Sequence, residues 1–286
     1  MHKHEVTELL SRHGLKPEKR FGQNFLIDAN ILNKIVDSAE VTDNDLVIEV
    51  GPGLGVLTKE LAVRAKRVIS IEIDKKLLSV LEQELYGFSN ITLIQGDAMR
   101  LDIKKIIDDA RLQEKIQCVK IVANLPYNIT TPFICTCLEQ ELGIERIVVM
   151  VQKEAAERFL AKPGTKAYGA ATLTASCFAN AQLIATVPPS CFYPAPDVTS
   201  AITRFDVFAR PIIPAVNRAF VFEVVRAAFA MRRKTLVNCL TLLAFTKPQI
   251  ITALESVGID ANVRGETLSL PQFEQLAMVL IALPSQ

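Results

Sequence analysis

The segment Asn124-Leu125-Pro126-Tyr127 combines groups that suit methylation of an aromatic amine. The exocyclic nitrogen of such an amine is a poor nucleophile, because its lone pair is delocalised into the ring. The amide oxygen of Asn124 and a main-chain carbonyl near Pro126 could accept its two N–H bonds and favour a pyramidal, more reactive nitrogen. Tyr127 can stack on the base, and Pro126, which has no N–H, stiffens the loop. The segment predicts methyl transfer driven by positioning, with a turn that caps a sheet as the alternative.

A glycine-rich loop, Glu49-Val50-Gly51-Pro52-Gly53-Leu54-Gly55, lies upstream of this segment. Glycine lets the backbone approach a ligand closely, and a helix that begins after the loop offers free N–H groups. A dinucleotide fingerprint would place its third glycine at position 56, where this chain has Val56. The loop therefore favours a nucleoside cofactor without a pyrophosphate, such as S-adenosylmethionine, over NAD. A tight strand-to-helix turn without a ligand is the alternative.

Two acidic residues strengthen the prediction of a nucleoside site. Glu72 ends a β-branched run 21 residues after Gly51, where a carboxylate can accept both ribose hydroxyls. Asp97 follows the next run and could accept a hydrogen bond from the exocyclic amine of an adenine. Either acid alone could equally be a helix cap or a loop carboxylate. Together with Gly51, they indicate one site along the carboxyl ends of adjacent strands.

The elements that must position these residues follow an alternating pattern. Short β-branched runs predict strands at 46–50, 67–72, 91–95, 119–123 and 145–151. Between and after them, apolar residues at helical spacing predict helices near 55–65, 75–86, 102–112, 153–161 and 168–178. Strands at 182–187 and 199–208 follow with no helix between them. The pattern predicts a Rossmann-like α/β fold, with a mostly parallel sheet that ends in an antiparallel edge.

A change of pattern near residue 210 predicts a second, all-helical domain over 210–286 after a first domain over 1–209. Residues 210–286 hold 8 basic and 5 acidic residues, whereas 1–209 hold 24 and 26. We predict one helix that carries an apolar stripe of Phe222, Val225, Phe229 and Leu236, with further helices near 248–257 and 271–282. Four basic residues are assigned to the stripe-bearing helix, and they predict either an RNA-phosphate contact or a solvated face: Arg226, Arg232, Arg233 and Lys234.

The overall composition excludes several other classes of protein. The formal net charge is +1, so binding to nucleic acid must come from a local patch. No apolar run approaches the length of a membrane span. The six cysteines show no CxxC pairs, which argues against a metal site or a disulfide scaffold. We expect a cytoplasmic, monomeric protein that uses no metal.

Several motifs, taken in order, resemble those of the small-subunit ribosomal RNA adenine N6,N6-dimethyltransferases. They are Gly22-Gln23-Asn24-Phe25-Leu26, the 49–55 loop, Asn124–Tyr127, Gln152-Lys153-Glu154, 192–201 and 229–236. The resemblance implies transfer of two methyl groups from S-adenosylmethionine to each of two adjacent adenosines in the 3′-terminal hairpin of small-subunit rRNA. It also implies a role in ribosome biogenesis, with a partly assembled small subunit as partner.

The resemblance also assigns roles to individual residues. It places Gln23, Asn24, Leu26, Gly51 and Gly53 at the cofactor, Glu72 on its ribose and Asp97 on its adenine. Asn124 would bridge the cofactor and the target amine, and Tyr127 would stack on the target adenine, with Phe192 or Tyr193 as a second face. Many relatives have His at the position of Asn24 and a basic residue at the position of Asp197.

Three other functions share part of this pattern. Large-subunit rRNA adenine N6-methyltransferases of the macrolide-resistance type share the cofactor loop and the Asn124–Tyr127 motif, but segments 193–201 and 232–236 favour the small-subunit type. Val56 argues against an NAD-dependent dehydrogenase. A non-catalytic rRNA-binding assembly factor would be favoured by loss of the cofactor loop or of Asn124, and this chain retains both.

Overall fold

The computed structural model describes residues 3–18 and 21–283, and the chain divides into two compact units. The first unit comprises Met1–Ala156 and Asn180–Val207, and the second comprises Glu157–Ala179 and Phe208–Gln286. The second unit thus begins again two residues before the predicted boundary at 210 and also takes in 157–179. Packing explains this grouping, since the ring of Phe178 stacks on that of Phe222 with centroids 6.0 Å apart.

The first unit is built around a seven-stranded sheet in the order β4-β3-β2-β5-β6-β9-β7. Neighbouring strands from β4 to β6 are parallel, and β9 runs antiparallel to β6. The strands are β2 (Asp45–Val50), β3 (Arg67–Glu72), β4 (Ile91–Gln95), β5 (Cys118–Asn124), β6 (Ile144–Gln152), β7 (Ala179–Val187) and β9 (Ser200–Val207). This mixed sheet confirms the predicted fold class.

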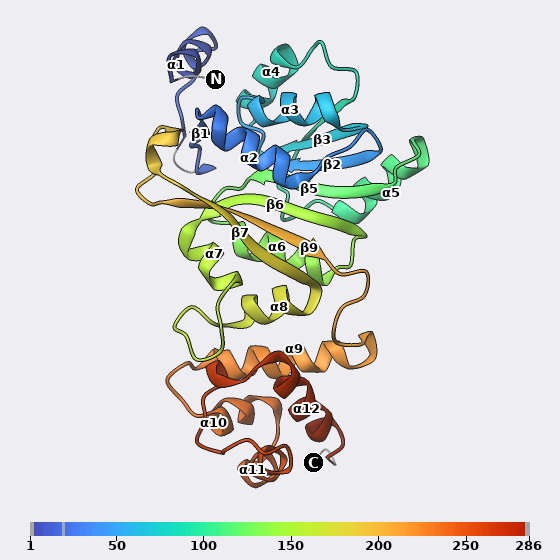
Figure 1. Cartoon of the computed structure of the whole chain (residues 1–286), viewed down its shortest axis with the longest axis vertical. Helices are drawn as coiled ribbons and strands as arrows, with labels where there is room; N and C mark the ends of the chain where they lie inside the picture. The colour runs from blue at the N-terminus through green and yellow to red at the C-terminus, as the bar shows by residue number, and fades with distance from the viewer. Residues whose placement is uncertain (1–2, 19–20, 284–286) are drawn as a thin grey trace. The chain divides into compact units, whose positions relative to one another are not determined.

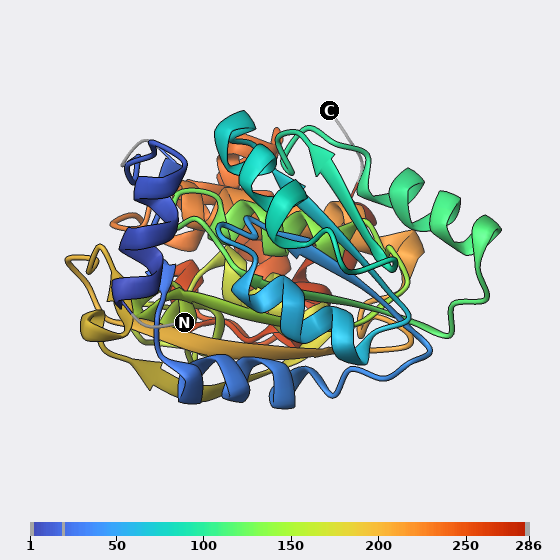
Figure 2. The same ribbon diagram turned by 90° about the horizontal axis from the view of Figure 1, so that it is seen from above.

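The helices of the first unit connect and cover these strands. They are α1 (Lys3–Arg12), α2 (Ala29–Ala39), α3 (Val56–Arg64), α4 (Lys75–Glu84), α5 (Ile103–Gln113), α6 (Thr130–Glu139) and the start of α7 (Lys153–Phe159). In Figures 1 and 2, α2 and α3 lie over one face of the sheet and α6 lies over the other. A separate short ribbon pairs β1 (Phe25–Leu26) with β8 (Phe192–Tyr193).

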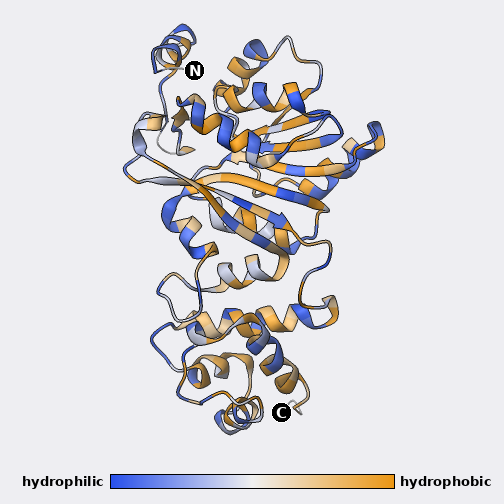
Figure 3. Ribbon diagram, in the orientation of Figure 1, coloured by the Kyte–Doolittle hydropathy of each residue, from blue (hydrophilic) through white to orange (hydrophobic). Residues whose placement is uncertain are grey.

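The core of the first unit forms where amphipathic helices cover buried strands. Val47, Val122 and Val148 project from three adjacent strands and belong to one cluster with Ile35 of α2 and Leu61 of α3. Figure 3 shows the alternation of hydrophobic and hydrophilic residues along α2 and α3, as expected for helices that face a core on one side. This packing holds the strand ends, and therefore the loops that follow them, in fixed positions.

The end of α2 is fixed by cations from the sheet. Lys120, Arg146 and Arg204 each donate a hydrogen bond to one of the main-chain carbonyls of residues 38–40. The last carbonyls of a helix have no partner within the helix and carry its negative dipole end, so cations stabilise this terminus. Arg146 and Arg204 also form ion pairs with the carboxylate of Glu40. Their hydrogen bonds lower the pKa of Glu40.

The second unit is helical. Its elements are α8 (Ala170–Phe178), α9 (Ala215–Ala230), α10 (Leu236–Leu240), α11 (Lys247–Ser256) and α12 (Leu270–Ile281), with 3-10 turns η3 (Thr241–Leu243) and η4 (Gly265–Thr267). A third 3-10 turn, η2 (Pro189–Cys191), belongs to the first unit. Within the part of the chain that the structure describes, no single helix has the length and composition of a membrane span; the pair Leu236–Leu243 and Lys247–Ser256 does so only together, across a bend of 117°.

The prediction of one helix through Leu236 was wrong. Helix α9 ends at Ala230, and a turn leads to α10, for which Thr235 is the N-cap. The N–H of Lys234 donates to the carbonyl of Met231 within this turn. The apolar spacing continued across the turn because Leu236 is also buried, on the next helix. Arg232, Arg233 and Lys234 therefore lie in an exposed turn, and Arg226 alone of the four lies on α9.

Candidate active site

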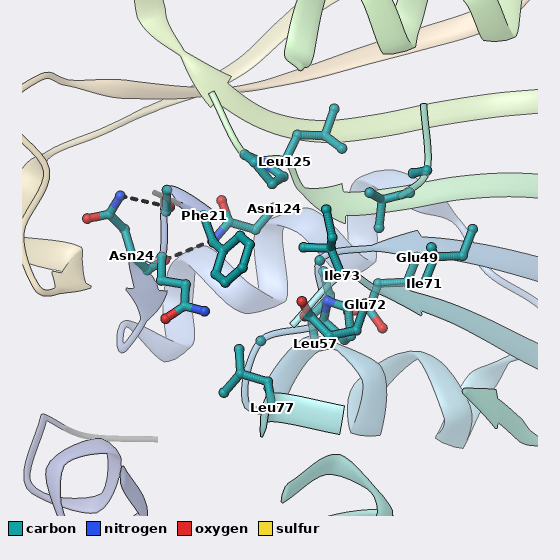
Figure 4. A pocket seen from close by; sticks show the side chains of 18 of the residues that line it. Phe21, Asn24, Glu49, Leu57, Ile71, Glu72, Ile73, Leu77, Asn124 and Leu125 are labelled. Atoms are coloured by element: carbon teal, nitrogen blue, oxygen red, sulfur yellow. Dashed lines mark hydrogen bonds between the residues drawn. The ribbon is translucent and has the colours of Figure 1, made fainter. Parts of the chain in front are cut away.

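A cavity of about 300 Å³ lies in the first unit, at the carboxyl ends of strands β2 to β5. Loops after these strands form one side, and the segment from Phe21 to Leu26 forms another. Figure 4 shows Glu49, Glu72 and Asn124 around this cavity. Open parallel sheets bind ligands at this edge, because successive loops splay apart there.

The structure brings most of the predicted site residues together. All of the predicted cofactor residues and the three predicted catalytic residues of segment 124–127 line the cavity: Gln23, Asn24, Leu26, Gly51, Gly53, Glu72, Asp97, Asn124, Pro126 and Tyr127. The remaining predicted residues do not line it. Phe192 and Tyr193 lie on β8, and the four basic residues belong to the second unit.

The glycine loop adopts a conformation that side chains would hinder. Gly51 and Gly53 have φ values of 69° and 60°, in the left-handed region. A Cβ on Gly53 would lie 3.2 Å from the ring of Phe25, which also lines the cavity. Gly55 is the N-cap of α3, so the first turn of that helix begins directly after the loop. The loop thus presents bare backbone to the cavity.

Glu72 is the buried acid at the end of β3. Glu72 is 4% exposed, and its Oε1 accepts a hydrogen bond from the N–H of Asp74 at 2.8 Å. Burial raises the pKa of Glu72 to about 7, although backbone N–H bonds act in the opposite direction. A carboxylate in this position can accept hydrogen bonds from the hydroxyl groups of a ligand that fills the cavity.

Glu49, at the end of β2, is a second buried carboxylate that the sequence analysis treated only as part of the loop. Its Oε2 accepts hydrogen bonds from Thr58 at 2.6 Å and Ser70 at 2.7 Å. Burial raises its pKa to about 7. These bonds tie the start of the glycine loop to α3 and β3. The sequence signal for this role was an acidic residue inside a buried strand, because such a residue needs hydrogen-bond partners.

Asp97 is the more exposed acid of the site. Its Oδ1 accepts from the N–H of Met99 at 2.9 Å, and its Oδ2 lies 3.4 Å from Nε of Arg100. Part of the carboxylate therefore shapes its own loop, which is the alternative considered for this residue. The residue nonetheless lines the cavity beside Gly96 and Ala98.

The segment before β1 lines the cavity and is held by side-chain hydrogen bonds. Nε2 of Gln23 donates to Asp74 at 2.9 Å, and Oε1 of Gln23 accepts from the N–H of Glu18 at 2.7 Å. The Nδ2 of Asn124 donates to the main-chain oxygen of Asn24 at 3.2 Å, drawn as a dashed line in Figure 4. This bond uses the donor end of the Asn124 amide, so Oδ1 is the end that can accept a hydrogen bond from a ligand.

Tyr127 is fixed at both ends of its side chain. Its backbone lies in the loop between β5 and α6, and its hydroxyl is 2.7 Å from Oγ of Ser200 at the start of β9. Burial raises the pKa of the Tyr127 phenol, so this group stays protonated at neutral pH. The two other aromatic candidates differ in exposure. Phe192 is 3% exposed and packs in the core, whereas Tyr193 is partly exposed, with Nζ of Lys3 5.4 Å from its ring centroid.

The four basic residues predicted to contact RNA are exposed, and Arg232 among them also has a structural contact. A guanidinium nitrogen of Arg232 donates to the main-chain oxygen of Tyr168. Lys19 and Arg20, two further basic residues that from their place before Gly22 could flank the same RNA, lie outside the described residues.

Comparison with known proteins agrees with this arrangement. Residues 14–281 match the family described as ribosomal RNA adenine dimethylase. The chain belongs to this family. The prediction of the family and of a methyltransferase is thereby confirmed.

Curated relatives cover almost the whole chain. A protein from Lachnoclostridium phytofermentans named ribosomal RNA small subunit methyltransferase A is 42% identical over 280 residues, covering 96% of each chain. A protein of the same name from Bacillus mycoides is 44% identical and covers 96% of this chain and 95% of its own.

Two solved structures share the architecture of this dimethylase. A dimethyladenosine transferase from Plasmodium falciparum has a TM-score of 0.73 and 28% identity, and covers 88% of this chain and 95% of its own. The 23S rRNA methyltransferase ErmE has a TM-score of 0.67 and 27% identity, and covers 90% of this chain and 100% of its own.

Proposed function

We propose that this protein dimethylates the N6 amines of two adjacent adenosines in the 3′-terminal hairpin of small-subunit rRNA, with S-adenosylmethionine as donor. It acts in the cytoplasm as a monomer, on a partly assembled small subunit, and uses no metal. The observation that carries the proposal is the convergence of Asn124, Glu72 and the glycine loop on one cavity at the ends of adjacent strands. The names of the curated relatives support the small-subunit target.

The residues that line the cavity fit a nucleoside with a short zwitterionic tail. Gly51 and Gly53 provide bare backbone, and Glu72 provides a buried acceptor for the ribose hydroxyls. The partly exposed carboxylate of Asp97 is the acceptor for the adenine amine. When bound, S-adenosylmethionine supplies an electrophilic methyl group on a sulfonium. The described part of the chain has no group of three His, Cys, Asp or Glu placed to hold a metal ion.

The segment Asn124–Tyr127 orients the target amine. Oδ1 of Asn124 accepts one N–H of the amine, while its Nδ2 donates to the carbonyl of Asn24. The carbonyl of Pro126 itself already accepts from Thr130 and from the N–H of Ile129, which occupies its two lone pairs. The second N–H is proposed to donate to a main-chain carbonyl near Pro126. These two acceptors favour the pyramidal nitrogen that attacks the methyl carbon. The nitrogen would gain the methyl group as the carbon–sulfur bond of the donor breaks and a neutral thioether leaves. The methylated nitrogen, which then carries positive charge and is acidic, would release its proton to water.

Tyr127 stacks on the target adenine, and Tyr193 is the candidate for a second aromatic contact. Phe192 is excluded from this role by its burial in the core. Arg226, Arg233 and Lys234 contact RNA phosphates, and Arg232 does so with the part of its guanidinium that Tyr168 does not engage.

The structural similarity to ErmE supports a second candidate, methylation of a large-subunit adenosine. The decisive experiment offers both targets in parallel. Purified protein is incubated with labelled S-adenosylmethionine and either small or large subunits that lack the modification, and digested rRNA is analysed by mass spectrometry. We expect N6,N6-dimethyladenosine at two adjacent positions of small-subunit RNA. Label in the large subunit alone would establish the second candidate, and no label in either would reject both.

A further inference from the structure

We infer that Ser200 is a positioning residue for methyl transfer, which acts by holding the ring of Tyr127 in place through a hydrogen bond to its hydroxyl. This inference rests on the proposed function, since it assigns the ring a role in seating the target base. The two oxygens are 2.7 Å apart, although the residues are 73 positions apart in the sequence. Ser200 itself does not line the cavity, whereas Tyr127 does.

The position of Ser200 in the sheet suits this role. Ser200 begins β9 and lies opposite Gln152, the last residue of β6. Asn124 lies opposite Met150 on the other side of β6. Ser200 and Asn124 are therefore held on the two sides of the same strand, β6. A rigid sheet sets the distance between them, which a loop could not do alone.

Burial makes the hydrogen bond necessary. Ser200 is 0% exposed, so its hydroxyl has no water to replace a lost partner. Tyr127 is only partly buried, with its ring at the cavity and its hydroxyl at the sheet. Without the bond, the ring is free to turn about its side-chain torsions, and a stacked base turns with it. A target that must be methylated twice is sensitive to this freedom, because it has to be presented in line with the donor both times.

The test is a double-mutant cycle with Tyr127→Phe and Ser200→Ala, which remove the two ends of one hydrogen bond. Each single variant should lower kcat about tenfold while the KM for S-adenosylmethionine stays within about twofold. The double variant should be no slower than the slower single variant. N6-monomethyladenosine should accumulate, because the second transfer needs the base to be seated again. Multiplicative losses in the double variant would overturn the inference.

Thr203→Val is the matched control. Thr203 lies on the same strand and is also 0% exposed, and its Oγ1 finds no hydrogen-bond partner among the described residues. This variant should keep the wild-type kcat and product ratio. A purely structural role for Ser200 predicts a lower melting temperature with unchanged kcat at 25 °C, and that result would also overturn the inference.

A readout without turnover separates this inference from the proposed function. The chain has 4 tyrosines, so a protein labelled with carbon-13 at the tyrosine Cζ gives few signals. Ser200→Ala should shift the Tyr127 signal and leave those of Tyr86, Tyr168 and Tyr193 unchanged. An unmoved Tyr127 signal overturns the hydrogen bond whatever the RNA target. The kinetic cycle is run on whichever subunit the wild type labels, so label in the large subunit rejects only the proposed target.

Discussion

Gln23 and Asp74 are joined by a hydrogen bond of 2.9 Å that fastens the segment before β1 to the N-cap residue of α4. The bond spans 51 residues of sequence, and both segments border the cavity. It therefore helps to hold the chain from Phe21 to Leu26 beside the space where the cofactor is proposed to bind.

Gln23→Ala should weaken binding of S-adenosylmethionine about threefold to tenfold, because a part-buried hydrogen bond that orders the segment is lost. Isothermal titration calorimetry measures the change in Kd. Lys76→Ala is the control, since it removes an exposed ion pair with Glu18 from the same region and should change the Kd by less than about twofold. Equal effects of the two variants would contradict a specific role for Gln23.

Asn124→Ala should abolish methyl transfer and leave the Kd for S-adenosylmethionine within a few-fold of wild type. The variant removes the proposed acceptor of the target amine and one hydrogen bond to Asn24. Asn124→Asp keeps an acceptor oxygen and should retain measurable turnover. Loss of cofactor binding as severe as the loss of turnover in Asn124→Ala would show that the residue acts through the cofactor site.

Glu49→Gln should change how stability depends on pH. A carboxyl whose pKa is raised from 4.5 to about 7 in the folded state holds its proton more tightly than in the unfolded chain. Its contribution to stability is full below about pH 4.5 and is lost as the pH rises through 7. Both hydroxyl partners donate to one oxygen, Oε2, so Gln keeps the required acceptor.

The free energy of unfolding of Glu49→Gln relative to wild type should therefore rise between pH 5 and pH 8, by on the order of 2 kcal/mol. Urea titrations at several pH values measure this difference. A constant difference across that range would mean that the pKa of Glu49 is not raised.

Arg233→Ala combined with Lys234→Ala should weaken RNA binding and reduce the magnitude of the slope of log K against log salt by about 1 to 2. Arg232 is left in place because it also contacts the main chain of Tyr168. Lys104→Ala, which removes an exposed cation of α5 in the first unit, should leave the slope unchanged. Filter binding across a salt series gives the slopes. An unchanged slope in the double variant would show that Arg233 and Lys234 are solvated and do not contact RNA phosphates.

The strands that carry the site were predictable because their chemistry is local. The runs 67–72 and 91–95 are rich in β-branched residues and coincide with β3 and β4. Helices α2 and α6 were missed for different reasons. Helix α2 has an N-cap, Asp28, and a clear apolar stripe, so the sequence contained the signals that predict it. In α6, Thr, Ile and Cys disfavour a helix, and burial of Phe133 and Ile134 against the protein decides the outcome.

The meeting of Gly51, Glu72 and Asn124 at one cavity was predictable, because loops after neighbouring parallel strands must meet at one edge. The hydrogen bonds of the site were not predictable, since Gln23 with Asp74 and Tyr127 with Ser200 are pairs of residues distant in sequence. The predicted position of Arg232 to Lys234 on a helix failed because the apolar spacing of α9 happens to continue into α10. A periodic pattern does not register that the backbone has turned between two buried residues.

All residues that line the cavity come from the part of the chain between Phe21 and Ile129, within the first unit. The basic turn 232–234 belongs to the second unit. In the proposed function, the donor site is therefore encoded before residue 130, whereas the proposed phosphate contacts lie after residue 208. Substitutions in the turn 232–234 can change those phosphate contacts without altering any residue that lines the donor cavity.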